Sequence, residues 1–280
     1  MSLSRLNKQN LDFYLNQRLI HGVQDIRASC SAPIEHVKFL GMNSSFYTPE
    51  GSRTSSLSIT SLLTSHNEFL SCSGESGNFG FITKKDNPSN NILFGFESGY
   101  LSSYTCSAQI GQIPTVAANF EIFRDAGVIS DTIGALGASS AIFNPNLTPS
   151  LVNTNTIDIS IGDFSTNRVN SFTLTLNILR DPQYYLGATS PFSVRSVYPI
   201  EISCEFSIVM DDYSIQKMSD FAYNIKRNDN FYIKAKDFNG NSVNFDFSNS
   251  LCYFIDFSED ASFSVNSPAS ATIRYKGYLK

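Results

Sequence analysis

The sequence predicts a mainly β protein with two tandem β-sandwich or barrel-like domains and one or few flanking α-helices. The chain has 280 residues, which is enough for about two domains that each bury a core of their own. Aromatic residues make up 13% of the chain and charged residues 16%, a balance that favours half-buried strands joined by polar turns. Several segments also alternate between apolar and polar residues, as strands with one exposed face do.

A sequence repeat supports the duplication. Residues 22–41 align with residues 168–187 without a gap, and apolar residues fall on apolar residues along the strand-like part. Because a slip of one residue would turn every side chain to the wrong face, the matching parity indicates the same strand and turn in both places. A repeat distance of about half the chain suggests two copies of one domain in tandem. The aligned pairs are Val23 with Val169, Ile26 with Phe172, Ala28 with Leu174, Cys30 with Leu176, Phe39 with Tyr185, and Leu40-Gly41 with Leu186-Gly187.

The first half is expected to begin with an N-terminal arm or helix over residues 1–21, because leucines recur there near helical spacing. The first β-domain follows over residues 22–125. Its clearest strands are predicted at 104–110 and 115–123, where alternating residues flank a turn that contains Gly and Pro. Residues 126–156 are almost uncharged and rich in Ala, Gly, Ser, Pro, Asn and Thr, which predicts an inter-domain linker or a long loop.

The second β-domain is predicted over residues 157–280. Its clearest alternating segments are 171–178 and 201–208. Asn239-Gly240 separates two further runs, and Asn-Gly is the strongest short hairpin signal because both turn positions need a positive φ. The remaining strands of this half are predicted at 231–238, 242–248, 251–257 and 272–279.

One helix is expected between these strands. Ile215, Met218, Ala222 and Ile225 recur at helical spacing, as in a helix that packs on a sandwich. Asp211-Asp212 supply favourable charge at the start of this helix. Helix initiation is therefore a better interpretation of these two aspartates than a catalytic carboxylate pair.

Charge and cysteine usage limit the classes of function. The net charge is −5 and no Lys/Arg cluster is visible, which argues against tight electrostatic binding to nucleic acid. The N-terminus has no apolar signal core and no apolar run is long enough to span a bilayer, so we expect folding in a reducing cytoplasm. Five cysteines without close pairs argue against a disulfide framework or a zinc site. Cys30, Cys106 and Cys204 are predicted to be buried thiols in strands.

No catalytic, cofactor-binding or metal-binding residues are predicted. The three histidines, His21, His36 and His66, have no metal-ligand spacing, and no known catalytic signature occurs. The glycines of the segment 74–80 resemble a loose glycine loop, but the Lys-Ser/Thr of a phosphate-binding loop does not follow. The chain is therefore expected to be a structural or assembly protein and not an enzyme.

Three passages, at 99–123, 168–192 and 198–214, together resemble the major tail (tail tube) proteins of long-tailed bacteriophages. The terminal segment 262–279 fits this resemblance too. In that family each tube domain is a β-sandwich with a flanking helix. Six domains form a ring whose inner sheets join into one barrel around a lumen, and rings stack around a tape-measure protein before genomic DNA passes through. Long insertions at 43–100 and 126–156 depart from a minimal tube domain.

The resemblance implies partners and a location. With two tube domains in one chain, three chains would complete a pseudo-hexameric ring, and a ring of six chains is the second expectation. Other partners are the tape-measure protein, further tail proteins and transient, non-specific contact with DNA in the lumen, without membrane insertion. The expected location is the virion tail, assembled in the host bacterial cytoplasm.

Two segments carry more specific hypotheses. If 201–208 belongs to the inner sheet, Glu201 and Glu205 face the DNA and repel it; otherwise they face outside solvent. The segment 181–197 contains Tyr184, Tyr185 and Phe192, which either seal the contact between stacked rings or fill the core of the sandwich.

Two other functions remain open. A trimeric baseplate hub or distal tail ring also uses paired tube-like domains, but is present as one ring per particle. A β-sandwich carbohydrate-binding module would need an exposed aromatic platform, which the tyrosine content permits without locating it.

Overall fold

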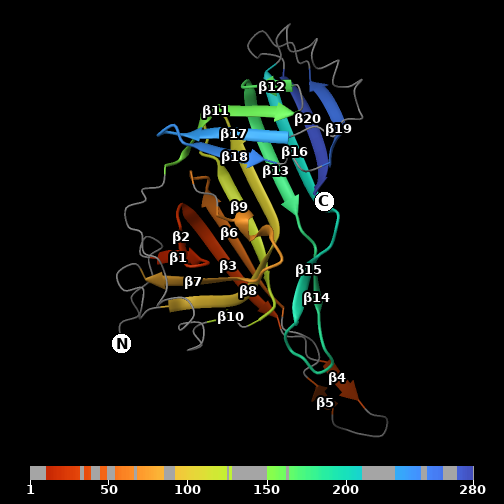
Figure 1. Ribbon diagram of the computed structural model, residues 1–280. Coiled ribbons are helices and arrows are strands. Elements are labelled where there is room, and N and C mark those ends of the chain that lie inside the picture. The colour runs from red at the N-terminus through yellow and green to blue at the C-terminus, as the bar shows by residue number, and fades with distance from the viewer. Residues whose placement is uncertain are drawn as a thin grey trace.

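The structure, a computed structural model, is mainly β, which confirms the predicted fold class (Figure 1). It describes residues 11–31, 35–38, 45–48, 54–65, 68–84, 92–124, 126–127, 150–161, 164–209, 231–246, 251–260 and 270–279. The helical structure within these residues is a 3-10 turn, η2, at Leu70–Ser73. The helix predicted from Asp211 onward lies outside them.

The main sheet of the fold contains a run of eight adjacent strands. This run consists of two blocks of four antiparallel strands, β3-β6-β9-β8 and β13-β16-β20-β19, which are joined because β8 pairs with β13. We call this run the long sheet. Its first block contains β3 (Val23–Ser31), β6 (Thr54–Leu62), β9 (Thr115–Ile122) and β8 (Ile92–Gln109). Its second block contains β13 (Val169–Asn177), β16 (Ile200–Val209), β20 (Ser270–Leu279) and β19 (Leu251–Asp260).

A second layer covers one face of each block. In the first half it has the order β2-β1-β7-β8, where the first part of the long strand β8 also pairs with β10. In the second half it has the order β12-β11-β17-β18, and Figure 1 shows β11, β17 and β18 crossing the strands of the long sheet. The strands are β1 (Leu11–Leu15), β2 (Arg18–Ile20), β7 (Asn78–Lys84), β10 (Ala126–Gly127), β11 (Val152–Ile161), β12 (Phe164–Thr166), β17 (Phe231–Asp237) and β18 (Ser242–Asp246).

The strand order therefore occurs twice, and so does the register. The pairing of β3 with β6 shifts by one residue after Val23, and the pairing of β13 with β16 shifts in the same way after Val169. Leu57 of β6 pairs with Phe120 of β9, and the corresponding strands of the second half pair Cys204 with Tyr275. These matches extend the sequence repeat from one strand to a whole block.

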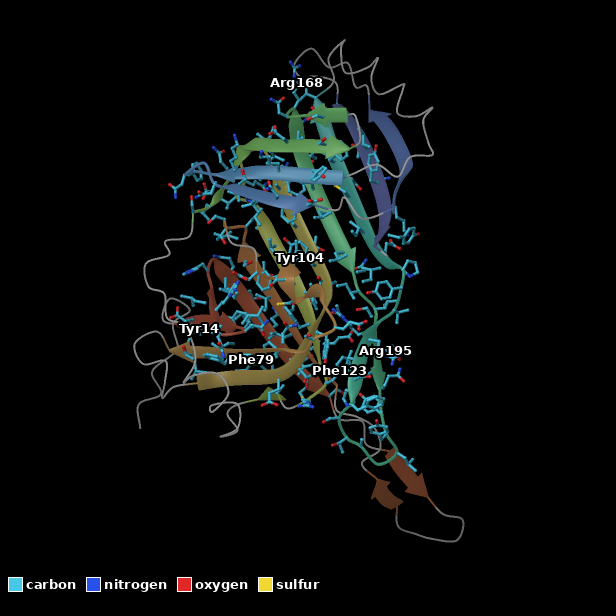
Figure 2. All side chains as sticks on the ribbon, viewed as in Figure 1. Tyr14, Phe79, Tyr104, Phe123, Arg168 and Arg195 are labelled. Carbon is cyan, nitrogen blue, oxygen red and sulfur yellow. The ribbon has the colours of Figure 1, made fainter. Side chains whose placement is uncertain are left out.

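Alternation of side chains explains why the core lies between the layers. Phe172, Leu174 and Leu176 of β13 are buried, as are Ile202, Cys204, Phe206 and Ile208 of β16. These are the faces predicted from the sequence for 171–178 and 201–208. Tyr104 of β8, labelled in Figure 2, reaches Phe245 of the second layer, with ring centroids 6.5 Å apart. Burying one such large apolar side chain contributes about 1.5–3 kcal/mol.

The prediction of a helix within residues 1–21 is wrong from residue 11 onward. Leu11–Leu15 and Arg18–Ile20 form the hairpin β1–β2, and Asn16 and Gln17 turn it with φ of 50° and 68°. Residues Leu11 to Leu15 also pair with β7. Phe13 and Leu15 enter the main core, while Tyr14 stacks on Phe81 on the opposite face. Burial on both faces of a paired strand outweighs the helical leucine spacing.

The two halves share one further feature. A hairpin follows the first strand of each block: β4 (Glu35–Lys38) with β5 (Ser45–Thr48), and β14 (Arg180–Gln183) with β15 (Ser193–Ser196). Both hairpins lie at the same end of the molecule (Figure 1). The predicted domain boundaries stay a prediction, although β11 already begins at Val152, inside the predicted linker 126–156.

Candidate assembly surface

The two ends of the long sheet present edge strands. Among the described residues, β3 pairs with β6 alone and β19 with β20 alone. The outer N–H and C=O groups of such strands are a template for another strand. β3 also contains a residue that the sequence analysis placed wrongly, because Cys30 was predicted to be buried and is exposed.

The exposure of Cys30 follows from its place at the edge. Its counterpart in the sequence repeat, Leu176, is 2% exposed because β8 and β16 flank it on both sides. Cys106 and Cys204 lie on inner strands and are buried, as predicted. Burial raises the pKa of Cys106 to about 12 and the pKa of Cys72 to about 11.

Among the described residues, the second layer covers only one face of the long sheet, and the other face is rich in hydroxyl and amide side chains. They bond across strands: Ser29 Oγ lies 2.7 Å from Ser56 Oγ, and Asn119 Nδ2 donates to Ser103 Oγ at 2.7 Å. The members of this polar face that point away from the core include Ser29, Ser56, Ser58, Ser103, Thr105, Ser107, Asn119, Thr173, Thr175, Asn177, Ser203 and Ser207.

Glu201 and Glu205 lie on this polar face, where each meets a cation of the neighbouring strand. Glu205 Oε2 accepts a hydrogen bond from Arg274 Nε at 2.8 Å, and Glu201 Oε2 lies 2.6 Å from Lys276 Nζ. The hydrogen bond with Glu201 raises the pKa of Lys276. Since both carboxylates are paired, they supply little uncompensated negative charge to the solvent in front of the sheet.

Arg180 anchors the hairpin β14–β15 to the first half of the chain. Its buried guanidinium donates to the carbonyl oxygens of Leu101, Ser73 and Gly74 at 2.9, 3.0 and 3.1 Å. It also donates to Ser196 Oγ of β15 at 2.8 Å. Burial lowers the pKa of Arg180, and the nearby acidic residues oppose that shift. Sequence reasoning missed this residue, because most of its partners are far away along the chain.

The aromatic tip of this hairpin is exposed. Tyr185 and Phe192 stack with ring centroids 4.2 Å apart, and Leu186 between them is exposed as well. These side chains therefore do not fill the core of the sandwich, which was one of the two interpretations of the segment 181–197. The side chain of Tyr184 is 36% exposed.

The residues weighed above for chemistry fall only partly within the described part of the chain. Within it, no group of three or more His, Cys, Asp or Glu side chains is placed to hold a metal ion. Gly80, in the segment compared with a glycine loop, lies so close to Phe96 that an added Cβ would approach the ring to 2.6 Å, which is a packing reason for glycine. His36, His66, Asp211 and Asp212 have no described side chain. Among the described residues there is no helix of the length and hydropathy that a membrane crossing needs.

Comparison with known proteins gives no family. No protein-family model matches the chain, and no curated protein matches it.

Proposed function

We propose that this protein is the subunit of a bacteriophage tail tube, in which rings of three chains stack around a channel for DNA. The observation that carries the proposal is the repeated block of the long sheet together with the junction of β8 and β13. In the proposed ring, each chain would supply two adjacent units. The sequence resemblance to major tail proteins supplies the rest: six such units close a ring, so three chains suffice.

The polar face of the long sheet suits the wall of the channel. Hydroxyl and amide groups are hydrated and uncharged, and the carboxylates of Glu201 and Glu205 are paired with cations. Such a wall neither binds a polyanion tightly nor repels it strongly, so DNA slides along it. The hypothesis that Glu201 and Glu205 face the DNA and repel it stays a prediction, and with both carboxylates paired we expect this repulsion to be weak.

The hairpins suit the contact between stacked rings. Both project at one end of the molecule, and the tip of β14–β15 exposes Tyr185, Leu186 and Phe192. Exposed apolar clusters of this kind are typical of protein contact sites. In the proposed tube this tip lies against the adjacent ring, the rings stack around the tape-measure protein, and further tail proteins meet the ends of the assembly.

Electron microscopy of the purified protein, with rotational averaging of end-on views, tests the proposal. We expect tubes or rings with six density units that a mass measurement assigns to three chains. Rings of six chains would still support a tail tube, but they would contradict the pseudo-hexamer of three chains. A monomer under all conditions, including high protein concentration, would contradict the proposal.

The alternative functions give different results. A baseplate hub or distal tail ring shares the topology, but forms a single ring that does not stack and occurs once per particle. A carbohydrate-binding module would bind glycans as a monomer. In that case the stacked pair Tyr185 and Phe192 is the first place to test, since it forms an exposed aromatic surface.

A further inference from the structure

We infer that strand β19 of one copy pairs antiparallel with strand β3 of a second copy, in a register that places Phe257 opposite Cys30 and Asp260 opposite Arg27. This inference rests on the self-assembly in the proposed function and specifies its contact. It follows from the junction that the chain already makes between its own two halves.

The junction of β8 with β13 is the template. It contains seven antiparallel pairs, from Ser103 opposite Asn177 to Gln109 opposite Ser171. Within it, Tyr104 pairs with Leu176 and Ser107 pairs with Thr173. β8 is the last strand of the first block and β13 is the first strand of the second block.

The last strand of the second block is β19, and its register identifies its equivalent positions. The pairing of β8 with β9 shifts by one residue between Leu101 and Ser103, and the pairing of β19 with β20 shifts between Phe254 and Asp256. Superimposing these two irregularities places Phe257 on the position of Tyr104. In the same way, Asp260 takes the position of Ser107.

The first strand of the first block is β3, and its equivalent positions follow from the sequence repeat. The repeat that aligns Val23 with Val169 places Cys30 on Leu176 and Arg27 on Thr173, and the shifts after Val23 and Val169 agree with it. Transferring the template therefore pairs Phe257 with Cys30 and Asp260 with Arg27. Five of the seven template pairs fall on described residues of β19 and β3.

The exposed edge of β3 has the chemistry that this contact needs. Ala28 and Cys30 are exposed, although the matching residues of β13, Leu174 and Leu176, are buried. A second strand beside β3 would remove these side chains from water. Arg27 contacts Asp25 at 2.8 Å on the surface, a pair of the kind that contributes little to stability. Arg27 can therefore turn to an acidic residue across a new strand pair.

The partner has to be a second copy. β3 and β19 end the same eight-strand run, and seven strand spacings separate them by roughly 34 Å along the sheet. In the described part of the chain, β3 pairs with β6 and β19 pairs with β20, and the two strands do not pair with each other. Pairing head to tail repeats the internal junction between chains, so the sheet continues from one copy to the next and closes after a whole number of chains.

A disulfide tests the register. Directly opposed residues of antiparallel strands have Cα atoms about 4.5–5.5 Å apart, which is within the range that a disulfide bridges. The fifth cysteine of the chain, Cys252, lies on β19 itself, so we would use the full chain with Cys252→Ser as background and introduce Phe257→Cys opposite the native Cys30. After mild oxidation of the assembled protein we expect linked species on a non-reducing gel that stop at the trimer, because three bonds close the ring.

Matched variants control for chance linkage. Ser258→Cys is one residue away and points to the opposite face, so it should not link to Cys30. The pair Ser29→Cys and Ser258→Cys, with Cys30→Ser, should link as the first pair does. This second pair carries the test if Phe257→Cys fails to fold. Removing Cys30 from the Phe257→Cys variant should abolish its linkage.

The outcomes separate this inference from the proposed function. Rings or tubes that form without linkage at either pair would overturn the register and leave the tail tube standing. Linkage of Ser258→Cys to Cys30, or dimers linked through Cys30 of both copies, would overturn the inference as well. Linked trimers that never stack would support the edge contact and contradict the tube.

Discussion

Arg180 is the residue whose removal should reveal how the two halves are held together. It contacts three carbonyl oxygens of the first half from the base of a hairpin in the second half. Arg180→Met keeps the apolar stem of the side chain but leaves these three acceptors without a donor; Leu101 O is buried and the other two are partly buried. A buried unsatisfied group costs about 1–3 kcal/mol and a partly buried one costs less, so we expect the free energy of unfolding to fall by about 2–4 kcal/mol.

Urea unfolding followed by far-UV circular dichroism measures this loss. Arg195→Met is the matched control, because Arg195 lies on the same hairpin and is exposed; Figure 2 labels it. We expect the control to change stability by no more than about 0.5 kcal/mol. Equal effects of the two substitutions would contradict the anchoring role of Arg180.

Gly80 should be intolerant of a side chain for a packing reason. An added Cβ would lie 2.6 and 2.7 Å from two ring atoms of Phe96, which is fully buried and cannot move aside. We expect Gly80→Ala to destabilise the protein by at least about 1–3 kcal/mol, the usual cost of overpacking. Gly74→Ala is the control, since nothing lies within 4 Å of its added Cβ. Thermal unfolding of both variants checks the difference.

The edge strand β3 gives a prediction about thiol reactivity. At pH 8 the thiols of Cys72 and Cys106 stay protonated, because burial raises their pKa to about 11 and about 12. Deprotonation sets in only as the pH approaches these values, and burial also blocks access. In a Cys252→Ser background we therefore expect iodoacetamide to modify Cys30 of the monomer first.

Assembly should protect the same thiol. If β19 of another copy covers the edge of β3, the labelling rate of Cys30 should fall by at least about tenfold in rings, an estimate that follows from the loss of access. Mass spectrometry of the labelled peptides measures the rate. A rate that does not change on assembly would show that β3 stays exposed in the ring.

The hairpin β14–β15 carries the prediction for stacking. Tyr185 and Phe192 are exposed and contact each other, so the double substitution Tyr185→Ser and Phe192→Ser should leave the fold intact, with a stability change within about 1 kcal/mol. We expect rings to form but not to stack, as seen by electron microscopy. Tyr232→Ser, an exposed tyrosine on β17, is the control and should stack normally. Loss of folding in the double variant would contradict this role.

The elements that sequence reasoning predicted well are those whose environment is local. The segments 171–178 and 201–208 alternate because each has one buried and one polar face, and β13 and β16 follow them closely. The hairpin at Asn239-Gly240 was also predicted, and Gly240 has a positive φ of 84°. Asn239 does not have a positive φ, so only one of the two turn positions has the predicted conformation.

The elements and site residues that it missed depend on distant partners. Cys30 alternates like its counterpart Leu176, but the sequence does not say that β3 lies at an edge. The only local hint is the size of the side chains, because Ala28 and Cys30 stand where the second half of the sequence repeat has leucines. Nothing near Arg180 in the sequence points to the carbonyls that it contacts. The pairing of β1 with β7 is equally non-local.

At the scale of the whole molecule, the two halves are continuous. One hydrophobic cluster contains Leu57 and Phe120 of the first half together with Leu174 and Phe206 of the second. The junction of β8 with β13 adds seven pairs of residues to this shared core. Domains that contact each other only through a linker would unfold separately, whereas a shared core and sheet couple the two halves.

We therefore expect the monomer to unfold in a single cooperative transition, and a substitution in one half to destabilise both. Phe206→Ala, in the core of the second half, should lower the free energy of unfolding by about 3–5 kcal/mol. Hydrogen exchange with mass spectrometry can follow peptides of β6 and β16 separately. In the variant, both should lose protection together, because opening β16 also exposes the strands across the junction. If β6 kept its protection while β16 lost it, the halves would be independent units, and ring closure would then have to hold together domains that the chain itself does not couple.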